Sequence, residues 1–161
     1  MIRIALDLDD TIFDFLGTYQ EMFPGESNLT NKNITKNVYN LRKNKHFWEN
    51  LPLLEFPNFE PCIYATKRIN SKIYTRNCLN KHGLPIKPIY QIYTQTDNKV
   101  RIIKGHCDVL IDDSEFNCYQ ALKVGFPAIL ITRPHNINSD YPYRINKLDL
   151  NEIMEVYNCI V

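Results

Sequence analysis

A dense acidic segment near the N-terminus constrains this chain more than any other feature. Residues 2–8 are apolar apart from Arg3 and Asp7, which is the pattern of a short buried strand. Asp7, Asp9 and Asp10 then place three carboxylates within four residues. Because side chains alternate along a strand, Asp7 and Asp9 lie on the same side and can share a cation. The segment therefore predicts a buried strand that ends at a cation-dependent site.

Further along the chain, short apolar segments alternate with segments of helical periodicity. We expect strands at 62–65, 89–93, 109–111 and 128–131, and helices at 11–22, 69–82, 97–105, 114–124 and 150–157. Strands that alternate with helices of about a dozen residues predict right-handed crossovers and a mostly parallel sheet with helices on both faces. The expected fold class is therefore α/β, with a doubly wound, mostly parallel sheet of five strands.

The stretch between the first two strands differs from the rest. It is rich in Asn and is interrupted by Pro and Gly, yet apolar residues recur in it at helical spacing. A chain of 161 residues has room for one domain and a small insertion. We therefore expect a core formed by residues 1–11 and 60–161, with a small helical cap inserted at 12–59, after the first strand.

Charge and cysteine content disfavour several classes of partner and site. Lys and Arg number 19 against 18 Asp and Glu, so the chain lacks the positive excess that long nucleic acids select. Its five cysteines form no C-x-x-C pair, which argues against a disulfide framework or a structural zinc site. No apolar run is long enough to span a bilayer, and the N-terminus does not resemble a secretion signal. We expect a cytoplasmic protein with neither long nucleic acid nor membrane as a partner.

The acidic residues at two strand ends suit a magnesium ion. Carboxyl ends of parallel strands meet at one edge of the sheet, so Asp112 and Asp113, after the fourth strand, are expected near Asp7 and Asp9. Mg2+ takes oxygen ligands and keeps several waters. We expect its ligands to be Asp7, Asp9, either Asp113 or Asp112, and a phosphate oxygen of a substrate.

A carboxylate beside such a cation can attack a phosphoryl group. We expect Asp7 to be this nucleophile, and Asp9 to protonate the leaving oxygen and then to deprotonate the attacking water. The phosphoryl oxygens also need a donor and a balancing cation, which Thr66 and Lys99 can supply. These residues predict Mg2+-dependent hydrolysis of a phosphate monoester through an aspartyl-phosphate.

In their order along the chain, these residues resemble the four signatures of the haloacid dehalogenase (HAD) superfamily of phosphohydrolases. The first signature, D-x-D-x-T, begins at Asp7, the second is Thr66, and the fourth is the acidic pair after the fourth strand. The third is a lysine upstream of that strand, where Lys99 matches the spacing better than Lys104, which is kept in reserve. The resemblance spans nearly the whole chain and implies that Asp9 also binds the metal through its backbone carbonyl.

Within that superfamily, the chain looks most like the 5'(3')-deoxyribonucleotidase family. The supporting runs are F-W-E-N-L-P at 47–52, T-K-R at 66–68, V-L-I-D-D at 109–113 and H-N at 135–136. The resemblance implies that an aromatic residue of the cap packs near the base and that residues after the second-signature threonine contact the substrate. Candidate substrate contacts are Phe47, Trp48, Thr66, Lys67 and Arg68. The chain departs from the family in two ways, because its linker before the second strand carries no helix and its cap is short.

Several alternatives stay open. The substrate could be another small phosphate ester or a polynucleotide end, the fold could bind phosphate without turnover, and a homodimer is also open. The acidic pair of the fourth strand could merely cap the next helix, because carboxylates favour a helix N-terminus. Phe47 and Trp48 could pack the cap onto the core. Lys67, Arg68 and Arg133 could be either solvated charges or substrate contacts.

Overall fold

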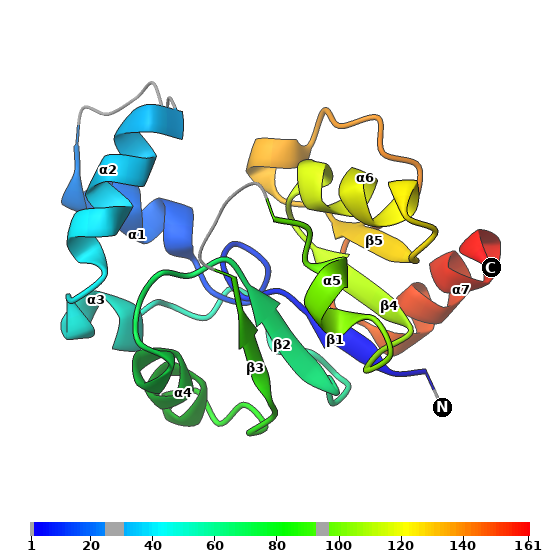
Figure 1. The fold of residues 1–161 in the computed structure, drawn as a ribbon, viewed down its shortest axis with the longest axis horizontal. Helices are drawn as coiled ribbons and strands as arrows, with labels where there is room; N and C mark the ends of the chain where they lie inside the picture. The colour runs from blue at the N-terminus through cyan, green and yellow to red at the C-terminus, as the bar shows by residue number, and fades with distance from the viewer. Residues whose placement is uncertain (1, 25–30, 93–96) are drawn as a thin grey trace.

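A computed structural model gives the fold, shown in Figure 1. The structure describes residues 2–24, 31–92 and 97–161, and the side chains of these except 31–35. The strands are β1 (Ile4–Leu6), β2 (Ile63–Thr66), β3 (Ile89–Gln91), β4 (Val109–Asp112), β5 (Ala128–Ile131) and β6 (Arg144–Ile145). The helices are α1 (Phe15–Met22), α2 (Asn31–Leu41), α3 (Lys45–Glu49), α4 (Lys72–Lys81), α5 (Val100–Ile103), α6 (Glu115–Lys123) and α7 (Leu150–Ile160). A short 3-10 helix at Pro134–Asn136 follows β5.

The strands form one parallel sheet in the order β3-β2-β1-β4-β5-β6. Ala5 of β1 pairs with Ile63 of β2 on one side and with Leu110 of β4 on the other. The predicted parallel α/β sheet is thus confirmed. The predicted number of five strands was wrong, because the two-residue strand β6 adds a sixth at the edge beside β5. Two residues are too few to form a recognisable apolar alternation.

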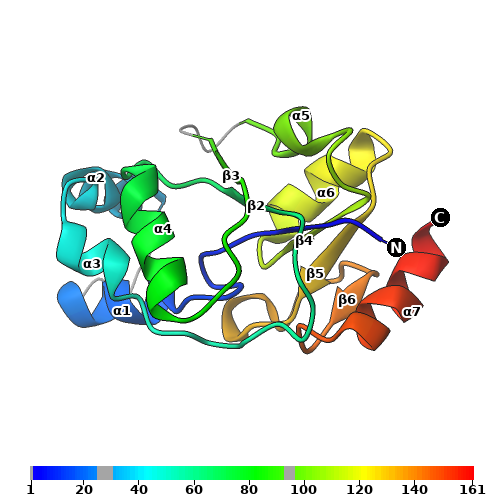
Figure 2. The same ribbon diagram turned by 90° about the horizontal axis from the view of Figure 1, so that it is seen from below.

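Both faces of the sheet are covered, which explains why its strands are apolar throughout. Ile4 and Leu6 of β1 point into one hydrophobic core, together with residues of α4 and α7 such as Leu79 and Ile153. Ala5 points into a second core, formed with residues of α5 and α6. Figure 2 shows α5 and α6 on one side of β4 and β5, and α7 on the other. The sheet is therefore the centre of a three-layer fold.

The described residues between β1 and β2 form three helices, α1, α2 and α3. Figure 1 shows them beside α4, at one end of the molecule. The side chain of Asp14 caps α1 by accepting a bond from Gly17 N at 2.9 Å, and Asn44 caps α3 by accepting one from Phe47 N at 3.1 Å. The segment expected to be helical thus contains helices. Its residues 25–30 lie outside the part of the chain that the structure describes. The division into a core and a cap at 12–59 stays a prediction.

The core helices differ from the sequence predictions mainly at their ends. α4 begins after its N-cap Ser71, three residues later than expected, and is followed by Gly83 with a φ of 69°, a conformation that glycine adopts without strain. α5 spans only Val100–Ile103 of the expected 97–105. The last residue predicted for the third strand, Tyr93, lies outside the described residues. Within the described ranges, no helix is both long enough and apolar enough to cross a membrane.

Candidate active site

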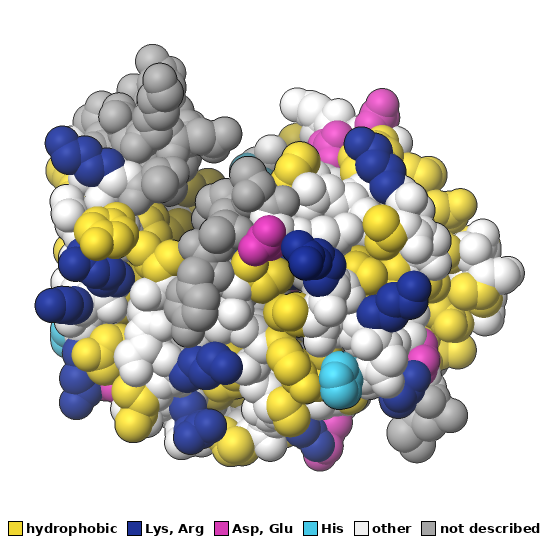
Figure 3. Space-filling model, in the orientation of Figure 1, with side chains coloured by type: hydrophobic (Ala, Val, Ile, Leu, Met, Phe, Trp, Pro, Cys, Tyr) yellow, Lys and Arg dark blue, Asp and Glu magenta, His cyan; other side chains and the backbone are white. Residues whose placement is uncertain are grey.

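The carboxyl ends of three neighbouring strands converge on one pocket. Asp7 directly follows β1, Thr66 ends β2 and Asp112 ends β4, and β1 lies between the other two strands. This is the point at which the strand order reverses, where sheets of this kind bind ligands. The pocket has a volume of about 550 Å3 and is lined both by these strand ends and by residues of α1, α2 and α3. Figure 3 shows the surface hollowed between the part that carries these helices and the part that carries α6.

The floor of the pocket is a buried acidic cluster. Asp7, Asp112 and Asp113 each offer a carboxylate oxygen, and the three oxygens lie within 4.8 Å of one another. All three residues are buried. Burial raises the pKa of Asp7 well above its usual range, and Lys99 partly opposes this while the two neighbouring carboxylates add to it. An additional cation at this cluster would favour the ionised form of Asp7.

Lys99 is the cation already present in the cluster. Its side chain is buried, and its ammonium group donates to Asp7 and, at 2.7 Å, to Oδ2 of Asp112. Burial disfavours the charge, but the two carboxylates outweigh burial and raise the pKa of Lys99 above its usual value. Lys104, the other candidate, is exposed at the end of α5 and is not among the described residues that line the pocket.

Asp112 is held by the start of α6. Its Oδ1 accepts bonds from Ser114 N at 2.9 Å and from Nδ2 of Asn117 at 3.0 Å. The N-cap of α6 is Ser114, whose hydroxyl accepts a bond from Asn117 N at 3.4 Å. The capping of α6 is therefore carried by Ser114, and Asp112 is directed to Lys99 and the pocket.

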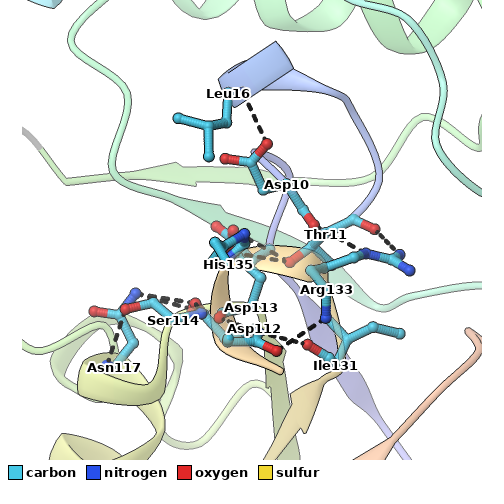
Figure 4. A network of polar contacts seen from close by, with 12 residues as sticks. Asp10, Thr11, Leu16, Asp112, Asp113, Ser114, Asn117, Ile131, Arg133 and His135 are labelled. Carbon is cyan, nitrogen blue, oxygen red and sulfur yellow. Dashed lines mark hydrogen bonds and ion pairs between the residues drawn. The ribbon is translucent and has the colours of Figure 1, made fainter. Parts of the chain in front are cut away.

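Asp113 is held by two other segments, as Figure 4 shows. Its Oδ1 accepts a bond from the Thr11 hydroxyl at 3.2 Å, and its Oδ2 lies 2.9 Å from Nε2 of His135. The bond to Asp113 raises the pKa of His135 above its usual value. Nδ2 of Asn136 donates to the backbone carbonyl of Asp113 at 2.8 Å. The H-N pair after β5 thus fixes the position of an acidic residue of the cluster.

Arg133 holds the loop that follows β1. Its Nε donates to the carbonyl of Asp10 at 3.0 Å, and its Nη2 donates to the carbonyl of Thr11 at 2.6 Å and to Oε2 of Glu55 at 3.1 Å. Figure 4 shows the guanidinium directed at this loop. Asp10 has a positive φ of 56°, which is uncommon for residues other than glycine. Its Oδ1 accepts a bond from Leu16 N at 2.8 Å. The guanidinium of Arg133 is thus bonded to the protein and is not a solvated charge. Arg133 is also not among the described residues that line the pocket.

Asp9 and Arg68 form a two-pronged ion pair at the pocket. Nη2 of Arg68 lies 2.6 Å from Oδ1 of Asp9, and Nε lies 3.0 Å from both carboxylate oxygens. Nη1 donates to the Thr75 hydroxyl at 3.2 Å. Arg68 is only 1% exposed. Both residues line the pocket, but the guanidinium that we expected to contact substrate is directed to Asp9 and Thr75.

Thr66 and Lys67 present polar groups to the pocket from the end of β2. The Thr66 hydroxyl is buried and has no hydrogen-bond partner among the described residues. A buried hydroxyl without a partner is costly, and its position in the pocket suits a bond to a ligand oxygen. Lys67 is half-buried, and its Nζ lies 5.5 Å from the centre of the Phe116 ring.

The two aromatic candidates of α3 differ in their surroundings. Trp48 is buried and lines the pocket, its Nε1 donates to the carbonyl of Leu41 at 2.8 Å, and its ring stacks on Phe15 with centroids 5.9 Å apart. Phe47 is not among the described residues of the pocket wall and packs edge-on against Phe15 and Trp48. Phe47 thus matches the packing alternative, whereas Trp48 both packs and faces the pocket.

The pocket wall also contains residues that the sequence did not single out. The described members are Phe15, Val38, Tyr39, Ile69, Phe116 and Asn117. Phe116 and Asn117 could have been found, since they lie in the first turn of α6, directly after the acidic strand end. Phe15, Val38 and Tyr39 carry no such signal, because their position depends on how α1 and α2 pack.

The comparisons with known proteins support the fold. No model of a known protein family matches the chain, and no curated protein matches it in sequence. Solved structures do match. One is a magnesium-bound crystal structure of YfnB from Bacillus subtilis, which is provisionally described as a HAD-hydrolase and is reported to show interdomain movement. The match has a TM-score of 0.58 at 16% identity and covers 98% of this chain and 99% of that one. At this identity, the match shows a shared fold.

Proposed function

We propose that this protein is a Mg2+-dependent phosphomonoester hydrolase of the HAD superfamily, with Asp7 as its nucleophile. The observation that carries the proposal is the buried cluster of Asp7, Asp112 and Asp113, in which Lys99 contacts Asp7 and Asp112. Beside it lies the Thr66 hydroxyl, which has no hydrogen-bond partner among the described residues. A structural role does not require three buried carboxylates this close together, because their mutual repulsion is costly. A metal and a phosphoryl group would use each of these residues. The fold shared with a magnesium-bound HAD-hydrolase supports this.

The donor set fits magnesium. The three carboxylate oxygens lie within 4.8 Å of one another, and oxygen ligands of this kind are those that Mg2+ prefers. We assign Asp7, Asp113 and Asp112 as its carboxylate ligands, and Asp9 as a ligand through its backbone carbonyl, as the superfamily resemblance implies. When bound, Mg2+ would neutralise charge on the phosphoryl oxygens and on the nucleophile.

The proposed reaction has two steps. A carboxylate oxygen of Asp7 attacks phosphorus, the bond from phosphorus to the ester oxygen breaks, and Asp9 gives its proton to that oxygen. Water then attacks the phosphorus of the aspartyl-phosphate, Asp9 takes the proton from the water, and Asp7 leaves as a carboxylate. Lys99 and the Thr66 hydroxyl hold the phosphoryl oxygens in both steps.

Arg68 takes part through Asp9. Because the carboxylate of Asp9 accepts both prongs of the guanidinium, it must turn partly away from Arg68 and take up a proton from solvent before it can act as the acid at the ester oxygen. Its side chain is 23% exposed and lines the pocket, which leaves room for this rotation. We therefore propose that Arg68 orients the acid/base residue and that Lys67 provides the positive charge nearer to the substrate.

Deoxyribonucleoside monophosphates are our proposed substrates, as the resemblance to the 5'(3')-deoxyribonucleotidases suggests. A pocket of about 550 Å3 is within the usual range for small-molecule ligands, and the phosphate end leaves space for a ring system. The five cysteines are free, which supports our proposal that the enzyme works in the reducing cytoplasm.

Release of inorganic phosphate from a substrate panel tests this function. The panel contains 5' and 3' deoxyribonucleotides, ribonucleotides, sugar phosphates and a 5'-phosphorylated oligonucleotide, each with Mg2+ and with EDTA. We expect Mg2+-dependent turnover that is fastest with deoxyribonucleotides. Turnover of other esters alone would keep the chemistry and reject the substrate. Absence of turnover throughout, in a protein that still binds phosphate, would show a binding module instead.

A further inference from the structure

The wall of the pocket contains an aromatic side chain with no assigned role. Phe116 is 57% exposed although it lines the cavity, so more than half of the surface of this residue is left uncovered by the protein. Exposed phenylalanine is unfavourable in water, and an exposed ring inside a ligand pocket is a surface that a ligand can cover. Phe116 therefore differs from Trp48, whose ring is already buried by the protein.

The position of Phe116 is fixed relative to the reacting groups. It is the second residue of α6, and the start of this helix is held by Ser114 and Asn117, which both bond to Asp112. The same carboxylate accepts the bond from Lys99. The backbone that carries the phenyl ring is thus connected to the acidic cluster through a short, hydrogen-bonded segment.

The surroundings of the ring favour a flat, apolar group beside a phosphate. The Lys67 ammonium lies 5.5 Å from the centre of the Phe116 ring, on the side of the pocket that carries Thr66. The described residues that line the same pocket also include Val38, Tyr39 and Ile69, which offer apolar surface. A ligand with phosphate on the acidic floor would place its remaining part among these side chains.

We propose that Phe116 is the specificity-determining residue of the site and stacks on an aromatic ring in the leaving group of the phosphate ester. The inference rests on the proposed function for the position of the phosphate, and it defines the substrate class as monoesters whose alcohol carries an aromatic ring or base. Phosphate esters without an aromatic ring, such as simple sugar phosphates, leave the Phe116 surface uncovered and bind more weakly.

Binding of two phosphonates tests this without turnover, since a carbon–phosphorus bond is not hydrolysed. Benzylphosphonate and methylphosphonate are titrated by calorimetry into the wild-type protein and three variants, in the presence of Mg2+. The variants are Phe116→Ala, Phe116→Trp and a control, Phe56→Ala, which removes a ring of similar exposure (53%) outside the described pocket wall.

We expect the wild type, Phe116→Trp and Phe56→Ala to bind the benzyl compound at least about tenfold more tightly than the methyl compound, and Phe116→Ala to lose this preference. Loss of affinity for both compounds alike in Phe116→Ala, or an unchanged preference, would overturn the inference. Phosphate release is measured separately on the same proteins. Absence of hydrolysis with a Phe116-dependent benzyl preference would reject the proposed function and leave the role of Phe116 standing.

Discussion

Replacement of Lys99 by Met tests whether this lysine balances the acidic cluster. Lys99 is 2% exposed and contacts two carboxylates, those of Asp7 and Asp112. Removal of one partner from a buried ion pair typically costs about 3–5 kcal/mol, because the remaining charge is buried without compensation. We expect a loss of this size in the free energy of unfolding without metal. For a chain of this length, it corresponds to a fall in Tm of about 10 °C.

Two conditions should reduce this loss. Mg2+ supplies a cation to the same carboxylates, so it should stabilise Lys99→Met more than it stabilises the wild type. Acidification to about pH 5 should also narrow the difference, because a carboxylate that has lost its partner can take up a proton instead. Turnover should be lost in the variant under all conditions.

The assay is urea unfolding followed by circular dichroism, with EDTA and with Mg2+, at pH 5 and pH 7.5. Lys104→Met is the matched control, because it makes the same substitution at an exposed lysine of the same segment. We expect the control to stay within about 0.5 kcal/mol of the wild type and to keep its turnover. A loss below 1 kcal/mol in Lys99→Met, or an equal loss in the control, would refute the assigned role of Lys99.

Substitutions at three further residues test other parts of the site. Thr66→Val should lower phosphate release at least tenfold while the unfolding free energy is unchanged, because the hydroxyl has no described partner in the protein; a matching loss of stability would argue against a role in phosphate binding. Arg133→Met should lower kcat more than it raises KM, because the loop after β1 loses its bonds to the guanidinium. Arg133→Lys should restore part of kcat. Equal kinetics in the wild type and both variants would contradict this. Burial raises the pKa of Asp10 to about 7. Between about pH 4 and pH 7, the folded protein therefore keeps a proton that the unfolded chain releases. The free energy of unfolding without metal should fall as the pH rises through this range. Asp10→Asn should reduce that slope in urea unfolding; a steeper slope would show that the sign is wrong.

The parts of the fold that could be predicted are the strands whose own apolar sequence already indicates that they are buried. The apolar runs that became β1, β2, β4 and β5 are buried on both sides, and such strands require helices on both faces of the sheet. Parallel strands then bring their carboxyl ends together, which is why Asp7, Thr66 and Asp112 lie in one pocket although they are far apart in sequence.

The parts that could not be predicted depend on tertiary packing. β6 is paired only through two residues, which are too few to form a pattern. The side chain of Arg68 turns back to Asp9, since a buried guanidinium needs a carboxylate and Asp9 supplies it. Arg133 likewise bonds to backbone carbonyls, which carry no information about residue type. Charged side chains that line or border a site are therefore the ones whose roles a sequence leaves most open.

Phosphate release by the Asp7→Asn protein tests the central claim most directly. The wild type and the variant are compared with Mg2+ on the best substrate of the panel, and thermal unfolding establishes that both are folded. We predict turnover in the wild type that EDTA abolishes, and no turnover in Asp7→Asn, because an amide cannot form the phosphorylated intermediate. Full Mg2+-dependent turnover in a folded Asp7→Asn protein would contradict the account.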